Sequence, residues 1–353
     1  MALSVHALDP LSDARWGELV ARHAKAGIFH TTGWLESLRR TYGYDPVVYT
    51  TSPPGERLRN GLLFCRVESW LTGHRLVSVP FTDHCEPLVD CMADMQVLLA
   101  SLEEQFRKEK WLYIEMRPLH QFEAATTLYR STFDYRFHQI DLEPSIDTLF
   151  RNCHKDSVQR KIRRAEREKL TYQDGRSEAL LQHFYRLLSL TRRRHQVPPH
   201  PLRWFRNLID CVGEALHIRV AFKSSRPVAA VLTLCHRDTL VYKYGCSDAQ
   251  FNPLGGMHLL LWTCIQEAKN KGLGRFDLGR SDCGHAGLIT FKDRWGAAQS
   301  TLTYSRYAPS AHSRGNFRES SRDWRLGLAK HVFAYAPSSF LSAAGNFLYK
   351  HIG

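Results

Sequence analysis

The chain has 353 residues, more than one ordinary hydrophobic core requires, so we expect two domains. A content of 43% apolar and 11% aromatic residues excludes an intrinsically disordered chain. The 48 Lys and Arg residues outnumber the 35 Asp and Glu residues and give a net charge of +13. This charge suits an anionic partner such as RNA, a nucleotide-bearing cofactor or an anionic membrane surface, or else serves solubility alone.

The nine cysteines show neither a CxxC pair nor a zinc-type spacing, and several stand in apolar runs such as VLTLCH. We therefore expect reduced core thiols, as in a cytosolic protein, and no bound metal. The first residues lack the pattern of a signal peptide, and no apolar run approaches the roughly 20 residues of a membrane-spanning helix. These patterns predict a cytoplasmic protein, or at most one attached to the inner face of a membrane.

Residues 1–140 are predicted to form a mixed α+β domain. Apolar residues at helical spacing indicate one helix around Trp16 and a second around Trp34. The runs VVYT, GLLFCRVES and HRLVSVPF follow, with turn residues between the first two, as expected of neighbouring strands. A helix with Leu98 and Phe106 and a strand over residues 111–116 complete the domain.

Residues 141–310 repeat this order of elements and predict a second α+β domain. One helix begins near Ile146 and continues into the basic stretch HKDSVQRKIRRAEREKL. Two further helices, the strand runs LHIRVAF, PVAAVLTLCH and TLVYKYGCS, and an amphipathic helix that ends at Gly272 come next. A buried strand with Phe276 and Leu278 then leads into a polar loop, and TLTYSRY closes the domain.

The basic stretch places four arginines on one helix face, because their spacing is i, i+3, i+4 and i+7. They are Arg160, Arg163, Arg164 and Arg167. A solvated helix would normally intersperse acids on that face. This arginine face either contacts an anionic partner or is merely exposed to solvent, and the sequence favours neither alternative.

Residues 311–353 differ in composition from the rest and predict a basic amphipathic helical tail. A polar stretch comes first, and DWRLGLAKHVFAYA and SSFLSAAGNFLYKHIG then carry an apolar stripe flanked by basic residues. This tail either packs back on the second domain or lies on an anionic membrane surface.

Two features near the end of the second domain carry candidate chemistry. Gly255-Gly256 before a helix would expose backbone N–H groups that suit an anion, although a plain tight turn is the commoner reason for such a pair. Asp277 at a strand end, with Asp282 and His285 in the loop beyond it, are candidate bases for deprotonating an acceptor. Asp277 could equally serve to fix that loop.

Several stretches, taken in order, carry a resemblance to a known family. They are QRKIRRAEREKL, RPVAAVLTL, VYKYGCSDAQFNPLGGMHLLLWTCIQEAKNKGLGRFDLG and GLITFKDRWG. Over residues 146–296 the chain resembles the acetyltransferase-like (GNAT) domain of the Fem family and its relatives. These include aminoacyl-tRNA-dependent peptidyltransferases of peptidoglycan synthesis and exopolysaccharide-associated acetyltransferases. FHTTGWLESLRRTYG extends a looser resemblance into the first domain.

The resemblance implies two tandem GNAT-like domains with mixed sheets, an acceptor bound between them, and direct transfer of an acyl group onto an amine. Phe291-Lys292 falls on the Phe-Lys pair of the family, which implies that Lys292 stabilises the developing oxyanion. Asp277 and His285 complete the catalytic candidates. Donor contacts are expected from Phe291, Gly255, Gly256 and Arg294. Phosphate or substrate contacts are expected from Arg160, Arg163, Arg164, Tyr244 and Arg280.

The resemblance also implies acyl-CoA or aminoacyl-tRNA as a co-substrate, and no tightly bound cofactor. Acetyl-CoA users carry a Q/R-x-x-G-x-G/A loop, whereas residues 252–257 are NPLGGM, which lacks the basic residue and the last small one. This difference and the basic charge favour aminoacyl-tRNA slightly. We expect an amine acceptor in cell-envelope or exopolysaccharide metabolism. The alternative is a non-catalytic RNA- or membrane-surface-binding protein on the same fold.

Overall fold

A computed structural model describes residues 4–120, 129–308 and 338–352 of the chain. Within these residues the chain divides into two compact units. Of the described residues, the first unit comprises 4–120, 129–134, 302–308 and 346–352, and the second comprises 135–301 and 338–345. The boundaries predicted from the sequence, 140/141 and 310/311, stay predictions.

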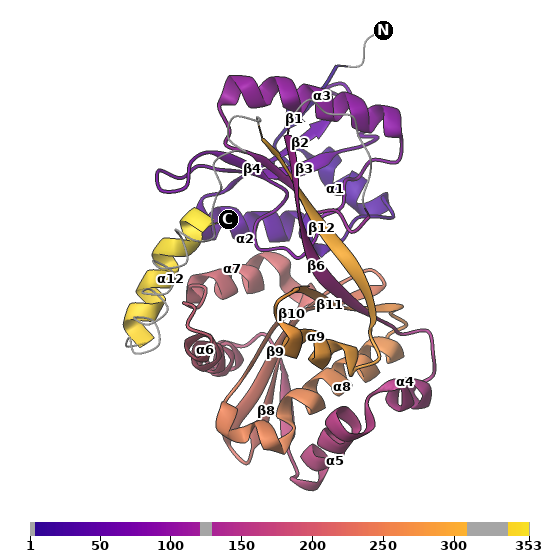
Figure 1. Cartoon of the computed structure of the whole chain (residues 1–353), viewed down its shortest axis with the longest axis vertical. Coiled ribbons are helices and arrows are strands. Elements are labelled where there is room, and N and C mark those ends of the chain that lie inside the picture. Colours follow the sequence, from indigo (N-terminus) through magenta and orange to yellow (C-terminus); the bar gives the residue numbers. More distant parts are fainter. Residues whose placement is uncertain (1–3, 121–128, 309–337, 353) are drawn as a thin grey trace. The chain divides into compact units, whose positions relative to one another are not determined.

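The first unit is built on a mixed sheet with the strand order β1-β2-β3-β4-β5-β12. Its strands are β1 (His6–Leu8), β2 (Asp45–Thr50), β3 (Leu62–Val67), β4 (Arg75–Val77), β5 (Ile114–Met116) and β12 (Ala298–Ala308). Only β4 and β5 pair in parallel, because α3 (Met92–Glu109) connects them across the sheet. The helices α1 (Ala14–Arg22) and α2 (Thr32–Tyr42) precede β2 (Figure 1).

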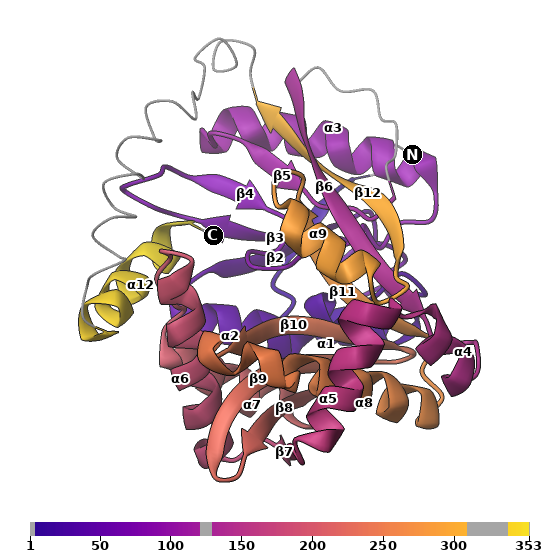
Figure 2. The same ribbon diagram turned by 60° about the horizontal axis from the view of Figure 1, so that its bottom comes forward.

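The second unit has a mixed sheet with the strand order β6-β11-β10-β9-β8-β7. Its strands are β6 (Tyr129–Asp141), β7 (Thr171–Gly175), β8 (Leu216–Lys223), β9 (Arg226–His236), β10 (Thr239–Ser247) and β11 (Arg275–Asp282). Its helices are α4 (Ile146–Asn152), η2 (Lys155–Gln159), α5 (Arg160–Arg167), α6 (Glu178–Arg194), α7 (Leu202–Val212), η3 (Gly213–Ala215), η4 (Ala249–Leu254), α8 (Gly256–Asn270) and α9 (Ala286–Asp293). Helices α5 and α8 cover one face of the sheet and α6 the other (Figures 1 and 2).

The parallel pair β10–β11 positions the site. These strands pair only through Thr239–Val241 and Arg275–Asp277. Beyond these residues the register of β10 shifts between Tyr242 and Tyr244, while β11 continues to pair with β6 on its other side. The ends of β10 and β11 are therefore not hydrogen-bonded to each other, and α8 follows β10 at this point.

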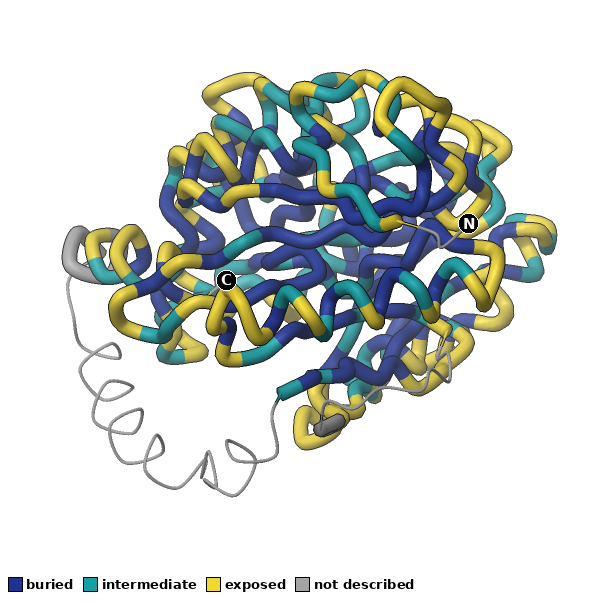
Figure 3. The backbone as a smooth tube through the Cα atoms, turned by 90° about the horizontal axis from the view of Figure 1, so that it is seen from above, coloured by how far each residue is buried: buried dark blue, intermediate teal, exposed yellow. Residues whose placement is uncertain are grey.

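Most strands are buried, as the dark blue segments of Figure 3 show, whereas the edge strand β7 is exposed. The core of the second unit joins strand residues such as Val231 and Phe276 to Leu261 of α8 and Ile162 of α5. That burial accounts for the apolar runs of the sequence. All nine cysteines are free, and five of them are buried, at positions 65, 85, 153, 246 and 264. Among the described residues, no helix has the length and apolarity needed to cross a bilayer.

The prediction of a mixed α+β fold is confirmed, but three local predictions are wrong. The helix from Ile146 is interrupted, because His154 begins a new helical segment by accepting a hydrogen bond from Ser157 N and donating its own N–H to Arg294 O. The closing loop after β11 contains a helix, α9, which carries Phe291 and Lys292. The run HRLVSVPF forms a strand only over Arg75–Val77.

Most of the predicted tail, residues 311–337, lies outside the described residues, and α12 covers Ser338–Ile352.

Candidate functional site

A cavity of about 250 Å³ lies at the start of α8 in the second unit. It is lined by Lys161, Val228, Ala229, Ser247, Phe251, Asn252, Gly256, Met257, His258 and Phe291. These residues come from α5, β9, the end of β10, η4, the first turn of α8, and α9. The cavity therefore lies where the chain leaves β10 and enters α8, which is a usual ligand position in folds with parallel strands.

The first turn of α8 offers backbone N–H groups to this cavity. The N-cap of α8 is Gly255, which has φ +84° and no side chain to accept a hydrogen bond from the turn. The first N–H groups of a helix have no acceptor within the helix, and no acidic side chain stands in the first turn of α8. The positive end of the helix dipole is thus available to an anion.

Both glycines stand where the chain packs closely. A Cβ on Gly255 would lie 2.3 Å from the backbone oxygen of Lys161, and the positive φ of Gly255 also disfavours other residues. A Cβ on Gly256 would lie 3.1 Å from Val228 Cγ2 and 3.2 Å from Ala229 Cβ. Gly255 lets α5 approach the start of α8, which brings Lys161 to the cavity, and Gly256 lets α8 start close to β9.

Lys161 is the lysine that lines the cavity, and it has no ion-pair partner among the described residues. Its positive charge and the N–H groups of α8 lie around the same space. His258 also lines the cavity, and burial, assisted by the Lys161 charge, lowers its pKa from 6.5 to about 4. The imidazole of His258 is therefore neutral at neutral pH, and Nδ1 of this ring has no hydrogen-bond partner. The chemistry of the cavity suits one anionic group.

Aromatic rings form one wall of the cavity. The imidazole of His258 stacks on Trp295, with ring centroids 5.8 Å apart and an angle of 24° between the planes. Phe291 packs edge-on against His258 at 5.8 Å. Phe291, a predicted donor-binding residue, thus lies at the cavity with Gly256, and Gly255 lies beside it.

Lys292 lies next to Phe291 in sequence but is buried, with 3% of its surface exposed. Its Nζ donates hydrogen bonds of 2.9 Å to the backbone oxygens of Gly279 and Arg280. The ammonium group is held against the irregular segment of β11, and Lys292 does not line the cavity. Its catalytic role stays a prediction.

Of the three candidate bases, Asp277 and His285 occupy different environments, and Asp282 pairs with Arg280. Asp277 is buried at 1% exposure, and its Oδ1 accepts a 2.6 Å hydrogen bond from Gly279 N, at the register shift of β11. His285 is the N-cap residue of α9, and 70% of its side chain is exposed. Neither lines the cavity at α8.

The predicted phosphate contacts are dispersed. Arg160, Arg163 and Arg164 are exposed on α5, with Arg164 paired to Glu168 and Arg163 lying over the ring of Phe150. Lys161 instead reaches the cavity. It follows Arg160 directly and stands four residues before the buried Ala165. A cation that borders the apolar face of α5 was the signal that the sequence offered for Lys161.

The other three predicted residues lie elsewhere in the second unit. The hydroxyl of Tyr244 accepts a hydrogen bond of 3.0 Å from Trp204 Nε1 inside the core. The guanidinium of Arg280 lies 4.2 Å from the ring centroid of Tyr135 and pairs with Asp282. Arg294 is exposed at the end of α9.

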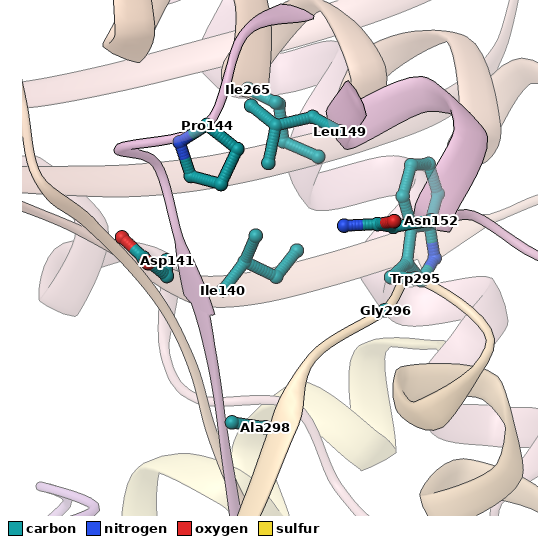
Figure 4. Close-up of a pocket in the computed structure, with 9 residues that line it drawn as sticks. All are labelled: Ile140, Asp141, Pro144, Leu149, Asn152, Ile265, Trp295, Gly296 and Ala298. Carbon is teal, nitrogen blue, oxygen red and sulfur yellow. The ribbon is translucent and has the colours of Figure 1, made fainter. Parts of the chain in front are cut away.

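A second cavity, of about 170 Å³, is lined by Trp295 (Figure 4). Asn152 and Trp295 lie together on one side of it and Asp141 on the other, with Ile140 and Leu149 between them. No group of three or more His, Cys, Asp or Glu residues in the described ranges could hold a metal ion.

A hydrogen bond between His138 and Asp293 fixes α9, which carries Phe291 and Lys292. His138 of β6 is fully buried, and its Nε2 lies 3.0 Å from Asp293 Oδ1. Burial lowers the pKa of His138, partly offset by Asp293. Together with the Lys292 hydrogen bonds, this pair attaches α9 to β6 and to β11.

The site thus combines two parallel strands that diverge, β10 and β11, with the helix between them in the chain, α8, whose N-terminus is open. Residues 152–292 match the family model described as an acetyltransferase (GNAT) domain. This match supports a transferase and confirms the resemblance to GNAT proteins, although not a particular subgroup. No curated protein sequence matches the chain.

Solved structures show the same fold at low sequence identity. FemX is 14% identical, with a TM-score of 0.66 over 85% of this chain and 96% of FemX. The C-terminal domain of a putative lysylphosphatidylglycerol synthetase from Agrobacterium fabrum is 13% identical, with a TM-score of 0.54 over 87% of this chain and 95% of that domain. A tandem GNAT protein from the clavulanic acid biosynthesis pathway is 10% identical, with a TM-score of 0.51 over 87% of this chain and all of that protein.

Proposed function

We propose that this protein is an N-acyltransferase that binds an activated acyl donor at the α8 cavity and moves the acyl group onto an amine. The observation that carries the proposal is the combination of open helix N–H groups, the Lys161 ammonium and an aromatic wall around one cavity. A donor with a phosphate close to its reactive end fits this combination. The GNAT domain match supports acyl transfer as the reaction class.

The favoured donor is aminoacyl-tRNA, with acyl-CoA as the second candidate. Arg160, Arg163 and Arg164 stand exposed on the helix that also carries Lys161, so cations continue outward from the cavity. An extended basic surface suits a long phosphate backbone better than one pyrophosphate. One structural neighbour is a putative lysylphosphatidylglycerol synthetase, a name that implies an aminoacylated product.

The reaction requires no covalent enzyme intermediate. The amine nitrogen attacks the acyl carbonyl carbon, the bond to the donor's ester oxygen or thioester sulfur breaks, and the amine loses a proton. Lys292 is proposed to stabilise the negative oxygen of the tetrahedral intermediate with the charge of its ammonium group, which its hydrogen bonds to the β11 backbone oxygens hold in place. Asp277 and His285 remain the proposed bases, with Arg280 and Arg294 as proposed contacts of donor or acceptor.

His258 is an addition that the sequence did not suggest. Because its imidazole is neutral at neutral pH, His258 can exchange a hydrogen bond with the donor without adding charge to the site. The acceptor is proposed to be an amine of cell-envelope or exopolysaccharide metabolism. A cytoplasmic location with peripheral membrane contact through the tail completes the proposal.

Transfer is tested by incubating the protein with labelled aminoacyl-tRNA or acetyl-CoA and a library of amines, followed by mass spectrometry. We expect an acylated amine, and we expect Lys161→Ala to raise the donor KM about tenfold, as loss of one charge-assisted phosphate contact does. Lys271→Ala, at the opposite end of α8, is the matched control and should leave KM unchanged. The absence of product from every donor would refute the proposal.

A second function, RNA binding without catalysis, is favoured by the exposed arginines of α5. It predicts salt-dependent binding of uncharged tRNA with no transfer to any amine. A triple change of Arg160, Arg163 and Arg164 to Gln would abolish that binding while Lys161→Ala would not.

A further inference from the structure

The loop that joins β3 to β4 in the first unit exposes large apolar side chains. Trp70 is 79% exposed and Leu71 is 50% exposed. Tryptophan is usually buried to a large extent in folded proteins, so this exposure at a loop calls for an explanation by function. The loop is not a loose segment, because Ser69 Oγ accepts hydrogen bonds from the N–H groups of Leu71 and Thr72.

The end of α12 is attached to this loop. His351 Nδ1 lies 2.9 Å from Ser69 Oγ, and the backbone oxygen of His351 accepts hydrogen bonds from Thr72 Oγ1 at 2.6 Å and Arg75 Nη2 at 2.7 Å. His351 and Arg75 are both buried. Residues 346–352 are therefore a fixed part of the first unit, and the end of α12 lies beside the β3–β4 connection (Figure 1).

This attachment brings together apolar side chains that are distant in sequence. The rings of Trp70 and Phe347 have centroids 6.4 Å apart, and Phe347 is 51% exposed. Leu112, which is 36% exposed, packs under the loop, since its Cδ1 lies 2.4 Å from the place of a Cβ on Gly73. We call Trp70, Leu71, Leu112 and Phe347 the apolar tip.

Basic residues border the apolar tip. Lys350 precedes His351 and is exposed, and Lys110 is exposed two residues before Leu112. Leu112 N donates to His74 O at 2.9 Å, which places Lys110 close to the loop. Glu68 is an exposed acid at the start of the loop. The chain as a whole carries a net charge of +13, so the electrostatic attraction of the protein is toward anionic surfaces.

We propose that the apolar tip inserts into the interfacial region of an anionic lipid bilayer. Tryptophan favours this region because its ring is apolar and its N–H is polar, and neighbouring lysines contact anionic headgroups. A stable protein partner would need to cover roughly 800 Å² of this chain, which four side chains do not supply. A few inserted side chains with basic neighbours suffice for reversible membrane attachment. This attachment specifies the peripheral membrane contact proposed above for the tail, and it is independent of the proposed acyl transfer.

The test uses the full chain and sucrose-loaded vesicles of phosphatidylcholine with 30% phosphatidylglycerol, compared with vesicles of phosphatidylcholine alone. We expect the wild-type protein to sediment with the anionic vesicles and to be released as salt is raised. The double variant Trp70→Ser/Leu71→Ser should lower the bound fraction at least fivefold. Phe347→Ser, on the other segment, should lower it about twofold.

Tyr172→Ser is the matched control, because Tyr172 is 41% exposed on β7 of the second unit and should not affect vesicle binding. Unchanged circular dichroism and melting temperature show that each variant is folded, and unchanged transfer to a water-soluble amine separates this result from the acyltransferase proposal. Equal sedimentation of the double variant and wild type overturns the proposal. So does a wild-type dimer or protein complex that the double variant dissociates while neither protein binds vesicles.

Discussion

The two units share a strand-helix-strand arrangement but differ at the start of its helix. In the first unit α3 connects the parallel strands β4 and β5, and in the second α8 connects the parallel strands β10 and β11 (Figure 1). The first turn of α3 contains Asp94, whose Oδ2 accepts a 2.8 Å hydrogen bond from the buried Asn60. The first turn of α8 contains no acid and faces a cavity with Lys161. The helix dipole is satisfied by the chain itself in one unit and left open in the other.

Buried acids at equivalent positions of the two parallel strand pairs also differ in their partners. Val77 of β4 pairs with Glu115, and Val241 of β10 pairs with Asp277, so each last parallel pair includes a buried acid. Glu115 forms ion pairs with Arg117 and Arg306. Asp277 accepts a hydrogen bond from its own strand at Gly279. The first unit thus uses its acid to hold structure, and the second is the unit to which we assign chemistry.

The largest expected effect is that of Gly255→Ala. The new Cβ would meet the backbone of Lys161, and the left-handed conformation adds strain, so we expect a loss of about 2–4 kcal/mol of unfolding free energy. Gly43→Ala in the first unit is the control, since Gly43 has φ +73° but no atom within 4 Å of its Cβ position. It should cost only about 1 kcal/mol. Urea unfolding of both variants measures the difference, and equal losses would show that close packing at α8 is unimportant.

The second-largest expected effect is the loss of the Glu115 charge, whose contribution to stability depends on pH. Burial would raise the pKa of Glu115, but the charges of Arg117 and Arg306 outweigh it and lower that pKa from 4.5 to about 2. Because the folded-state pKa is the lower one, the stabilisation is complete above pH 4.5 and is lost as the pH falls toward 2. The shift corresponds to about 3 kcal/mol. Glu115→Gln should therefore destabilise the protein at pH 7, and the difference from wild type should shrink toward pH 2.

Chemical unfolding of both proteins between pH 2 and 7 checks this dependence. A constant difference across the range would show that packing, and not the charge of Glu115, holds β5 to β12. At pH 7 we expect folded Glu115→Gln protein to keep its transfer activity. Asp277→Asn, at the equivalent position of the second unit, should lower transfer instead.

Whether a site residue could be predicted from the sequence depends on whether local pattern or packing between distant elements positions it. Gly255, Gly256 and Phe291 could be placed near one another from local pattern and family resemblance. Lys161 could not, because a residue at the border of the buried face of α5 meets the cavity only through the packing of α5 on α8. Tyr244 is predicted as a phosphate or substrate contact from its place in the chain, and its hydroxyl accepts a hydrogen bond from Trp204, so its role at the site stays a prediction.

The helices and strands show the same difference between local pattern and long-range contacts. The spacing of apolar residues predicted most helices and strands, because each of these elements buries one face. The break before η2 and the helix α9 depend on single contacts, such as the hydrogen bond from His154 N to Arg294 O, that join residues 140 positions apart. Such contacts leave no periodic signal in the sequence.

The smallest expected effect on stability is that of Asp94→Ala, which removes the acidic side chain from the first turn of α3. Asn60 also donates to Thr51 Oγ1, so loss of Asp94 removes the acceptor of its other N–H and should cost about 1–2 kcal/mol of unfolding free energy. Glu104→Ala on the exposed face of α3 is the control and should leave the unfolding free energy nearly unchanged, because its pair with Lys108 is solvent-exposed. An open helix start without a neighbouring cation and cavity should still not bind the donor, so Asp94→Ala should leave the donor KM unchanged. A lower KM in Asp94→Ala would mean that the helix dipole alone is sufficient for donor binding, and that Lys161 does not distinguish the two units.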